Sequence, residues 1–124
     1  MAEIRRYAAE ARSTDTFGRV LARARAHHLV VDGPTWNGCP GEAVTPGELF
    51  LAGVAACAVE LLEVIARDEG LPVPAARVEV RGEVDPANPA RPDLTVFNRV
   101  DLRFEVRGVT RDEADLLVER FTGR

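Results

Sequence analysis

The sequence predicts an α+β fold in which antiparallel strands are combined with a long central helix and a second, shorter helix. Three observations predict it: a long apolar stretch that opens with helix-capping residues, two stretches that alternate apolar and charged residues, and a second capped segment near the end of the chain. The 124 residues are 46% hydrophobic and 29% charged, which is the composition of one globular domain. We therefore expect a single domain over residues 1–124.

Residues 4–32 predict two or three antiparallel strands. Apolar and β-branched residues alternate loosely with Arg and Glu there, and turn-forming residues interrupt them near residues 13–15 and at Gly18. The clearest strand is 28–32. The following residues 37–41 contain too many Gly and Pro residues for regular structure, so we expect a loop.

A long helix is predicted to begin after Thr45. This residue has the character of an N-cap, a proline occupies the first helical position, and Glu48 completes a capping box. Residues 49–66 are apolar except for two Glu residues, so we expect the helix to be buried on most of its faces. It should end at residues 67–70, where a glycine can form the C-terminal cap.

The remaining chain predicts a hairpin and a helix. Residues 76–84 and 100–107 alternate apolar and charged side chains, which is typical of strands with one wet face, and a loop with three prolines, 85–92, separates them. Thr110 is an N-cap candidate, and acidic residues follow it in the first helical turn. The second helix carries an apolar stripe: Ala114, Leu117, Val118 and Phe121.

Composition argues against several classes of function. The net charge of −4, without long runs of like charge, argues against nucleic acid as the main partner. The longest charge-free apolar run, 49–59, has eleven residues, and a membrane-spanning helix needs about 18–20. The N-terminus lacks the apolar segment of a secretory signal. We therefore expect a cytoplasmic protein with no membrane partner, whose thiols are reduced.

The chain contains two cysteines, Cys39 and Cys57. Cys57 falls in the middle of the predicted long helix, where a cysteine can be a small core residue or a reactive thiol. The helix dipole fades within the first turn, so a reactive thiol at this position needs a group from elsewhere in the fold or from a partner chain. The pattern alone leaves both interpretations open.

No motif for a metal or an organic cofactor is present. Four residues of ligand type cluster in the first part of the chain, but their spacing matches no standard metal site: His27, His28, Asp32 and Cys39. We therefore predict neither a metal nor a cofactor.

Two segments resemble the OsmC/Ohr family. They are the strand 27–32, HHLVVD, and the helix start 45–57, TPGELFLAGVAAC, with a Gly-rich loop between them. In that family a strand ending in Asp, a loop and a helix opening with Pro-Glu precede a cysteine eleven residues after the proline, and Pro46 and Cys57 keep this spacing. The order of the later elements extends the resemblance over the whole chain, nearer to the less characterised OsmC-like branch.

The resemblance implies an intertwined homodimer of the cytoplasm, with the two long helices between sheets from both subunits. It also implies a cysteine-dependent peroxidase that reduces organic hydroperoxides and is regenerated by a dithiol reductant. Cys57 is then the nucleophile, which passes through a sulfenic acid. The substrate pocket would be apolar and lie at the dimer interface, floored by Phe50, Val54 and Leu61.

An Arg and a Glu assist the cysteine in the family, and the resemblance assigns these roles to Arg25 and Glu48. Family peroxidases place the Glu directly after the helix proline, where this chain has Gly47, so Glu48 is either catalytic or only a helix cap. Arg23 is the alternative to Arg25. The resolving cysteine of the family would fall at or past the end of this chain, so we expect a truncated sequence, Cys39 in its place, or a reaction without an intramolecular disulfide step.

A second hypothesis is an OsmC-like dimer that binds an apolar small ligand without peroxidase turnover. Two departures from the family pattern favour this hypothesis. Position 47 is Gly rather than Glu, and the predicted second helix contains no second cysteine. An ordinary reactivity of the Cys57 thiol would support this hypothesis.

Overall fold

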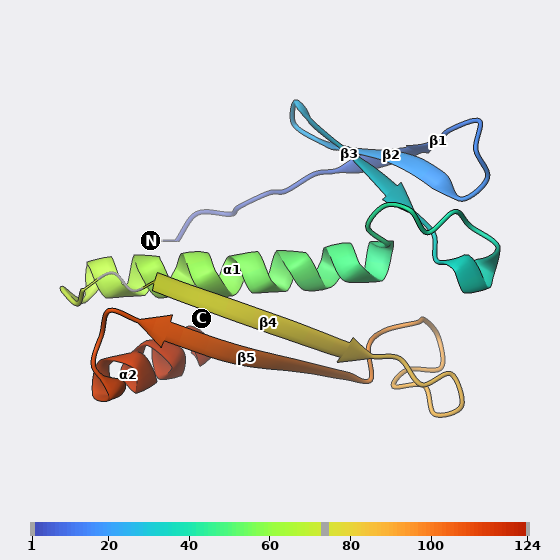
Figure 1. The fold of residues 1–124 in the computed structure, drawn as a ribbon. Helices are drawn as coiled ribbons and strands as arrows, with labels where there is room; N and C mark the ends of the chain where they lie inside the picture. Colours follow the sequence, from blue (N-terminus) through green and yellow to red (C-terminus); the bar gives the residue numbers. More distant parts are fainter. Residues whose placement is uncertain (1, 73–74, 124) are drawn as a thin grey trace. The chain divides into compact units, whose positions relative to one another are not determined.

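The computed structural model describes residues 2–72 and 75–123 (Figure 1). The chain divides into two compact units between residues 49 and 50. The first unit contains a three-stranded antiparallel sheet of strands β1 (Glu10–Ser13), β2 (Arg19–Ala24) and β3 (His27–Asp32), in that order. A single turn of 3₁₀ helix, η1 (Thr35–Asn37), lies in the loop that follows. The prediction of two or three strands is confirmed, with three.

Helix α1 spans Pro46–Asp68 and begins at the predicted capping box. The Thr45 backbone N–H donates to Glu48 Oε1 at 3.0 Å, and the Glu48 N–H donates to Thr45 Oγ1 at 3.3 Å. At the other end Gly70 adopts the left-handed conformation with φ +69°, and the Leu71 N–H donates to the Ala66 carbonyl at 2.8 Å. Both predicted ends of the long helix are therefore confirmed.

The second unit adds a hairpin and a second helix to most of α1. Strands β4 (Ala75–Glu83) and β5 (Arg99–Arg107) pair antiparallel, with Val78 opposite Phe104. Helix α2 (Arg111–Thr122) begins at a second capping box, in which the Thr110 side chain accepts from the Glu113 N–H. The predicted hairpin and the predicted N-cap are confirmed.

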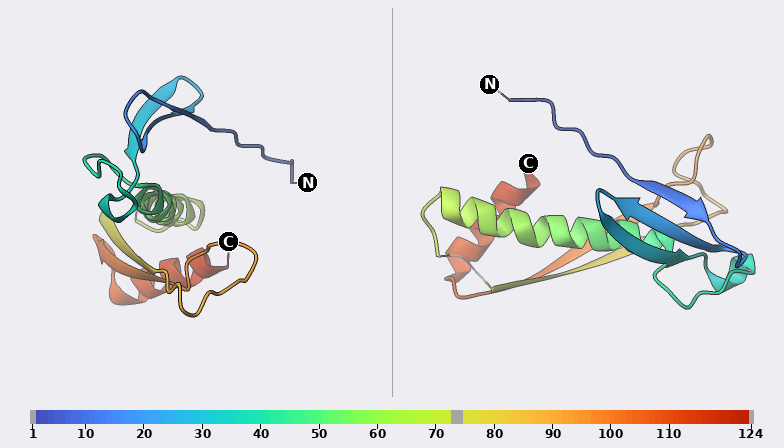
Figure 2. Two further views of the ribbon diagram at one scale, coloured as in Figure 1. Left: turned by 90° about the vertical axis from the view of Figure 1, so that its right-hand side faces the viewer. Right: turned by 90° about the horizontal axis from the view of Figure 1, so that it is seen from above.

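The core of the second unit lies where these elements meet. Figure 2 shows α2 crossing the C-terminal part of α1, and Leu62, Ile65 and Ala66 of α1 are buried there against Leu117 of α2. The apolar faces of the hairpin, including Phe104 and Val106, pack against this cluster. The core therefore holds the C-terminal half of α1 in place.

Helix α1 is less buried than the sequence predicted. Within the described chain only Ala58, Leu62, Ile65 and Ala66 of α1 are buried, and Phe50 is 57% exposed. The expectation of burial on most faces is therefore wrong for the single chain, because the hairpin and α2 supply only one apolar layer for an almost wholly apolar helix.

By length and composition alone, α1 could cross a membrane, and 22% of its most apolar stretch is buried within the chain. The charge-free run 49–59 is shorter than this helix, because Glu60 ends the run and Glu63 follows it within α1. Each carboxylate would cost about 3 kcal/mol near the centre of a bilayer. The absence of a membrane partner therefore stays a prediction, which these two charges support.

Candidate functional site

Cys57 lies in the middle of α1 with an exposed side chain. The next residue, Ala58, is fully buried, so the thiol lies just outside the buried face of the helix. Within the single chain, Cys57 is therefore not one of the buried core residues. The thiol is accessible, as a nucleophile must be.

The helix face around Cys57 is mainly apolar. Phe50 and Gly53 lie two turns and one turn before it, and both are exposed. Glu60 lies one turn after it and is also exposed. No basic residue lies within one turn of Cys57 on α1, so a group that activates the thiol has to come from outside this helix.

Glu48 belongs to the helix cap, as its pattern predicted. Its Oε1 accepts from the Thr45 N–H and also from the Thr45 hydroxyl, at 2.9 Å. The hydrogen bond from the Thr45 N–H, followed by that from the hydroxyl, holds the pKa of Glu48 below its usual range. All the hydrogen bonds that its carboxylate accepts from described residues end on Oε1, which leaves Oε2 for another donor.

The two candidate arginines differ in their surroundings. Arg23 lies on β2 and forms an ion pair with Glu10 on β1, at 2.7 Å. Arg25 lies in the tight turn between β2 and β3 with φ +55°, and its exposed side chain makes no ion pair with any described residue. Arg25 and Glu48 belong to the first unit and Cys57 to the second.

A buried ion pair that the sequence analysis missed ties the first sheet to the loop before α1. Asp32 is fully buried, and Arg19 donates to both of its carboxylate oxygens, at 2.8 and 2.9 Å. The backbone N–H groups of Glu42 and Ala43 also donate to Asp32 Oδ2, at 3.0 Å each. The Arg19 guanidinium is the main cause that lowers the pKa of Asp32 to about 2.

Cys39 packs against Gly18 and Gly33, which are the chain neighbours of Arg19 and Asp32. Its side chain is half-buried, and a Cβ placed on Gly18 or Gly33 would lie 2.4 or 2.5 Å from its Sγ. Cys39 therefore fills a niche that exists because both neighbours are glycines. This packing gives the thiol a structural role in the loop.

Comparison with known proteins identifies the family of this chain. The family described as OsmC-like protein matches residues 39–123. The chain belongs to the OsmC-like protein family. The matched region includes Cys57 and Glu48, whereas Arg25 lies before it. A comparison with curated proteins found no significant match.

Solved structures share the fold of this OsmC-like protein. An OsmC-like protein from Mycoplasma pneumoniae matches with a TM-score of 0.80 and 16% identity, over 97% of this chain and 82% of the other. An organic hydroperoxide resistance protein from Legionella pneumophila matches with a TM-score of 0.73 and 23% identity, over 98% and 85%. One from Elizabethkingia anophelis matches with a TM-score of 0.69 and 20% identity, over 99% and 85%. At these identities the likeness shows the α+β fold.

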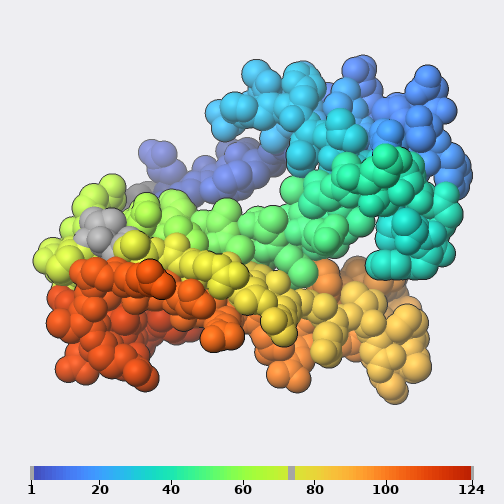
Figure 3. Space-filling view, in the orientation of Figure 1, coloured from blue at the N-terminus to red at the C-terminus, as the bar shows by residue number. Residues whose placement is uncertain are grey.

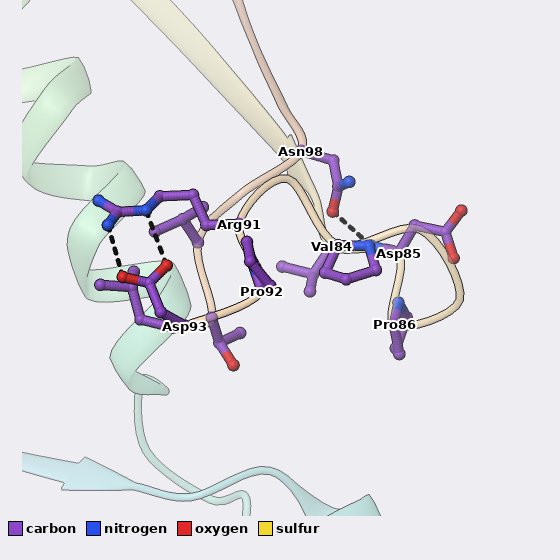
Figure 4. A pocket seen from close by; sticks show the side chains of 11 residues that line it. Val84, Asp85, Pro86, Arg91, Pro92, Asp93 and Asn98 are labelled. Carbon is purple, nitrogen blue, oxygen red and sulfur yellow. Dashed lines mark hydrogen bonds and ion pairs between the residues drawn. The ribbon is translucent and has the colours of Figure 1, made fainter.

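The loop between β4 and β5 is ordered by its own polar contacts in this OsmC-like protein. It projects from the end of the hairpin (Figure 3) and encloses a pocket of about 440 Å³, lined by residues between 84 and 98. Figure 4 shows that Arg91 pairs with Asp93, at 2.6 Å, and that Asn98 accepts from the Asp85 N–H, at 2.7 Å. The charged side chains of Arg91 and Asp93 are therefore engaged with each other at the pocket wall.

The same loop ends in an aromatic contact with α1. The rings of Phe97 and Phe50 stack with centroids 5.5 Å apart. A Cβ placed on Gly82 would lie 2.7 Å from the Phe97 ring, so this position of β4 must be glycine for the ring to lie there. Phe97 gave no signal in the sequence, because one aromatic residue in a loop has no periodicity to reveal its contact.

Among residues 2–72 and 75–123, no group of three or more His, Cys, Asp or Glu side chains could hold a metal ion. His27 and His28 lie on β3 and are exposed.

Proposed function

We propose that this OsmC-like protein is a cysteine-dependent peroxidase that reduces organic hydroperoxides, with Cys57 as the nucleophile. The observation that carries the proposal is an exposed thiol on an apolar helix face of an OsmC-family fold. The names of the Legionella and Elizabethkingia relatives, both organic hydroperoxide resistance proteins, support the substrate class. An apolar surface beside the thiol favours alkyl or aryl peroxides over hydrogen peroxide.

The proposed reaction has two stages. The Cys57 thiolate attacks one oxygen of the hydroperoxide, the O–O bond breaks, and the leaving alkoxide takes a proton to become an alcohol. Cys57 is then a sulfenic acid. One thiol of a dithiol reductant displaces its hydroxyl group as water, and the second thiol releases Cys57 while the reductant becomes a disulfide.

We assign supporting roles to Arg25 and Glu48. A guanidinium near the sulfur would stabilise the thiolate, and Arg25 is the candidate whose charge is not already paired with Glu10. The lowered pKa of Glu48 keeps its carboxylate ionised at neutral pH, so Oε2 can orient a guanidinium while Oε1 caps the helix.

We also propose that the protein acts as a cytoplasmic homodimer. The exposed apolar residues of α1, such as Phe50, Ala52 and Ala56, support a second copy as the cover of this helix. Cys39 is engaged in its glycine niche, which favours an external dithiol over Cys39 as the resolving thiol.

The proposal is tested by turnover of cumene hydroperoxide with a dithiol reductant. Cys57→Ser removes the nucleophile and should reduce turnover to background. Cys39→Ser is the matched control, because it exchanges the same atoms in the other cysteine. Wild-type turnover in Cys57→Ser would refute the mechanism.

The second hypothesis, an apolar-ligand-binding dimer without turnover, is favoured by one observation: α1 carries no basic residue within one turn of Cys57 that could activate the thiol. The two functions differ in a simple measurement. A binding protein would leave Cys57 reacting with cumene hydroperoxide no faster than a free thiol, whereas a peroxidase would react much faster.

A further inference from the structure

One face of the first sheet carries a small cavity. Its lining comes from all three strands: Glu10 and Arg12 of β1, Leu21 and Arg23 of β2, and His28 of β3. Across the strands, Glu10, Arg23 and His28 lie opposite one another. Arg12 lies opposite Leu21, two positions further along. Opposite residues point to the same side of a sheet, as do residues two positions apart, so these five side chains share one face. We call the hollow between them the sheet-face cavity.

Positive charge exceeds negative charge in the sheet-face cavity. The Glu10 carboxylate pairs with Nη2 of Arg23 at 2.7 Å, so these two charges compensate each other. Arg12 makes no ion pair with any residue in 2–72 or 75–123, and its guanidinium is therefore uncompensated. The whole chain has a net charge of −4, so a hollow with this excess of positive charge stands out from the rest of the protein. The cavity favours an anion.

The donors of the cavity can surround one small group. Arg12 and Arg23 are diagonal neighbours, with Cβ atoms about 7 Å apart, and Arg23 and His28 are direct neighbours at about 5 Å. These spacings are short compared with an arginine side chain, so both guanidiniums can reach the same point. The ion pair with Glu10 uses Nη2 of Arg23 and leaves Nε and Nη1 for another acceptor. Three neighbouring strands therefore supply N–H donors around one position.

We propose that the sheet-face cavity binds a phosphoryl group, as inorganic phosphate or as the end of a phosphate monoester. A phosphoryl group carries nearly two negative charges at neutral pH and three acceptor oxygens, which suit donors from Arg12, Arg23 and His28. A carboxylate offers one charge and two oxygens. The cavity has a volume of about 140 Å³. Pockets that enclose a whole drug-sized ligand have roughly 300–1,000 Å³, so the organic part of an ester would stay outside.

Titration of the isotope-labelled whole chain with inorganic phosphate, followed by NMR, tests the site. Salt at about 0.15 M screens exposed charges beyond about 8 Å, which suppresses diffuse attraction. Under these conditions phosphate should shift the backbone amide signals of Arg12, Arg23 and His28, with a Kd of about 1 mM or lower. The signals of β4 and β5 should not shift. The absence of a saturable shift in β1, β2 and β3 would overturn the inference.

A pair of variants separates a defined site from general attraction to positive charge. Arg12→Gln removes the uncompensated guanidinium without breaking an ion pair of the described chain, so the sheet should fold. The Kd for phosphate should rise about tenfold, because one charge-assisted hydrogen bond is lost. Arg107→Gln is the matched control, since it removes the same charge from an exposed strand residue outside the cavity. Equal weakening in both variants would overturn the site.

Two further probes test the class of the ligand and its source. Acetate should bind at least about tenfold more weakly than phosphate, and equal affinities would overturn the assignment to a phosphoryl group. Glycerol 3-phosphate that binds as tightly as phosphate or more tightly would support a monoester as the ligand, and weaker binding would support inorganic phosphate. The cavity belongs to the first unit and Cys57 to the second. Phosphate should therefore bind equally well to Cys57→Ser, and the result does not depend on peroxidase activity.

Discussion

Replacement of Leu62 by Ala tests whether the second unit positions the helix that carries Cys57. Leu62 is 0% exposed and lies in the cluster where α1 meets α2 and the hairpin. The substitution removes three carbon atoms, which corresponds to a transfer free energy of about 2.4 kcal/mol at about 0.8 kcal/mol for each carbon. The surrounding helices and strands cannot fully close the cavity, which adds to this cost. We expect a loss of about 3–4 kcal/mol in the free energy of unfolding.

Urea denaturation followed by far-ultraviolet circular dichroism measures this loss, because α1 and α2 dominate the signal. Leu94→Ala is the control: it deletes the same atoms from a side chain that is 46% exposed in the loop, and should cost less than about 1 kcal/mol. If Leu62→Ala were as mild as Leu94→Ala, the described core would not be what holds α1.

Three further predictions follow from single contacts. Asp32 has its pKa lowered from 3.8 to about 2, so its ionised form stabilises the fold fully above about pH 4 and loses this effect as the pH falls towards 2. Asp32→Asn should therefore be less stable than the wild-type protein at pH 7, with a difference that shrinks between pH 4 and pH 2; a difference independent of pH would exclude the ion pair with Arg19 as its source. Thr110→Ala should lower the free energy of unfolding by about 1 kcal/mol in the same denaturation assay, because α2 loses its N-cap, and Thr110→Ser should not. Cys39→Ser should keep peroxidase turnover with an added dithiol, while Cys39→Leu, which overfills the niche between Gly18 and Gly33, should lower the melting temperature; lost turnover in a stable Cys39→Ser protein would instead make Cys39 the resolving thiol.

Local sequence patterns predicted the elements of the fold well. The capping residues of both helices act within four positions of the chain, so Thr45 with Glu48, and Thr110 with Glu113, could be recognised before any tertiary contact was known. The alternating residues of β4 and β5 likewise identify one face of a hairpin by their period of two.

The burial of α1 could not be predicted, because an apolar face indicates that something covers it and does not say what does. Asp32 was recognised as the end of a strand but not as a buried ion, since its partner Arg19 is thirteen positions away. Nothing in the local sequence distinguishes Arg19 from the other arginines. Contacts between distant positions require the tertiary fold.

In the candidate site, too, a local pattern could be predicted from the sequence, whereas a contact between distant positions could not. The spacing from Pro46 to Cys57 identified the thiol and its family, because it is a local property of one helix. The contact of Phe97 with Phe50 joins a loop to a helix across 47 positions and depends on a glycine in a third element. The likeness to the family therefore indicated Cys57 as the nucleophile that we propose, and the structure was needed to reveal the contact between Phe50 and Phe97.

The most direct test of the central claim is the rate at which cumene hydroperoxide oxidises Cys57 in the fully reduced protein, followed by intact-protein mass spectrometry. Our account predicts oxidation much faster than that of a free thiol, a mass gain of one oxygen atom located at Cys57, and return to the original mass when a dithiol is added. Oxidation at the rate of a free thiol, or oxygen located elsewhere in the chain, would contradict it.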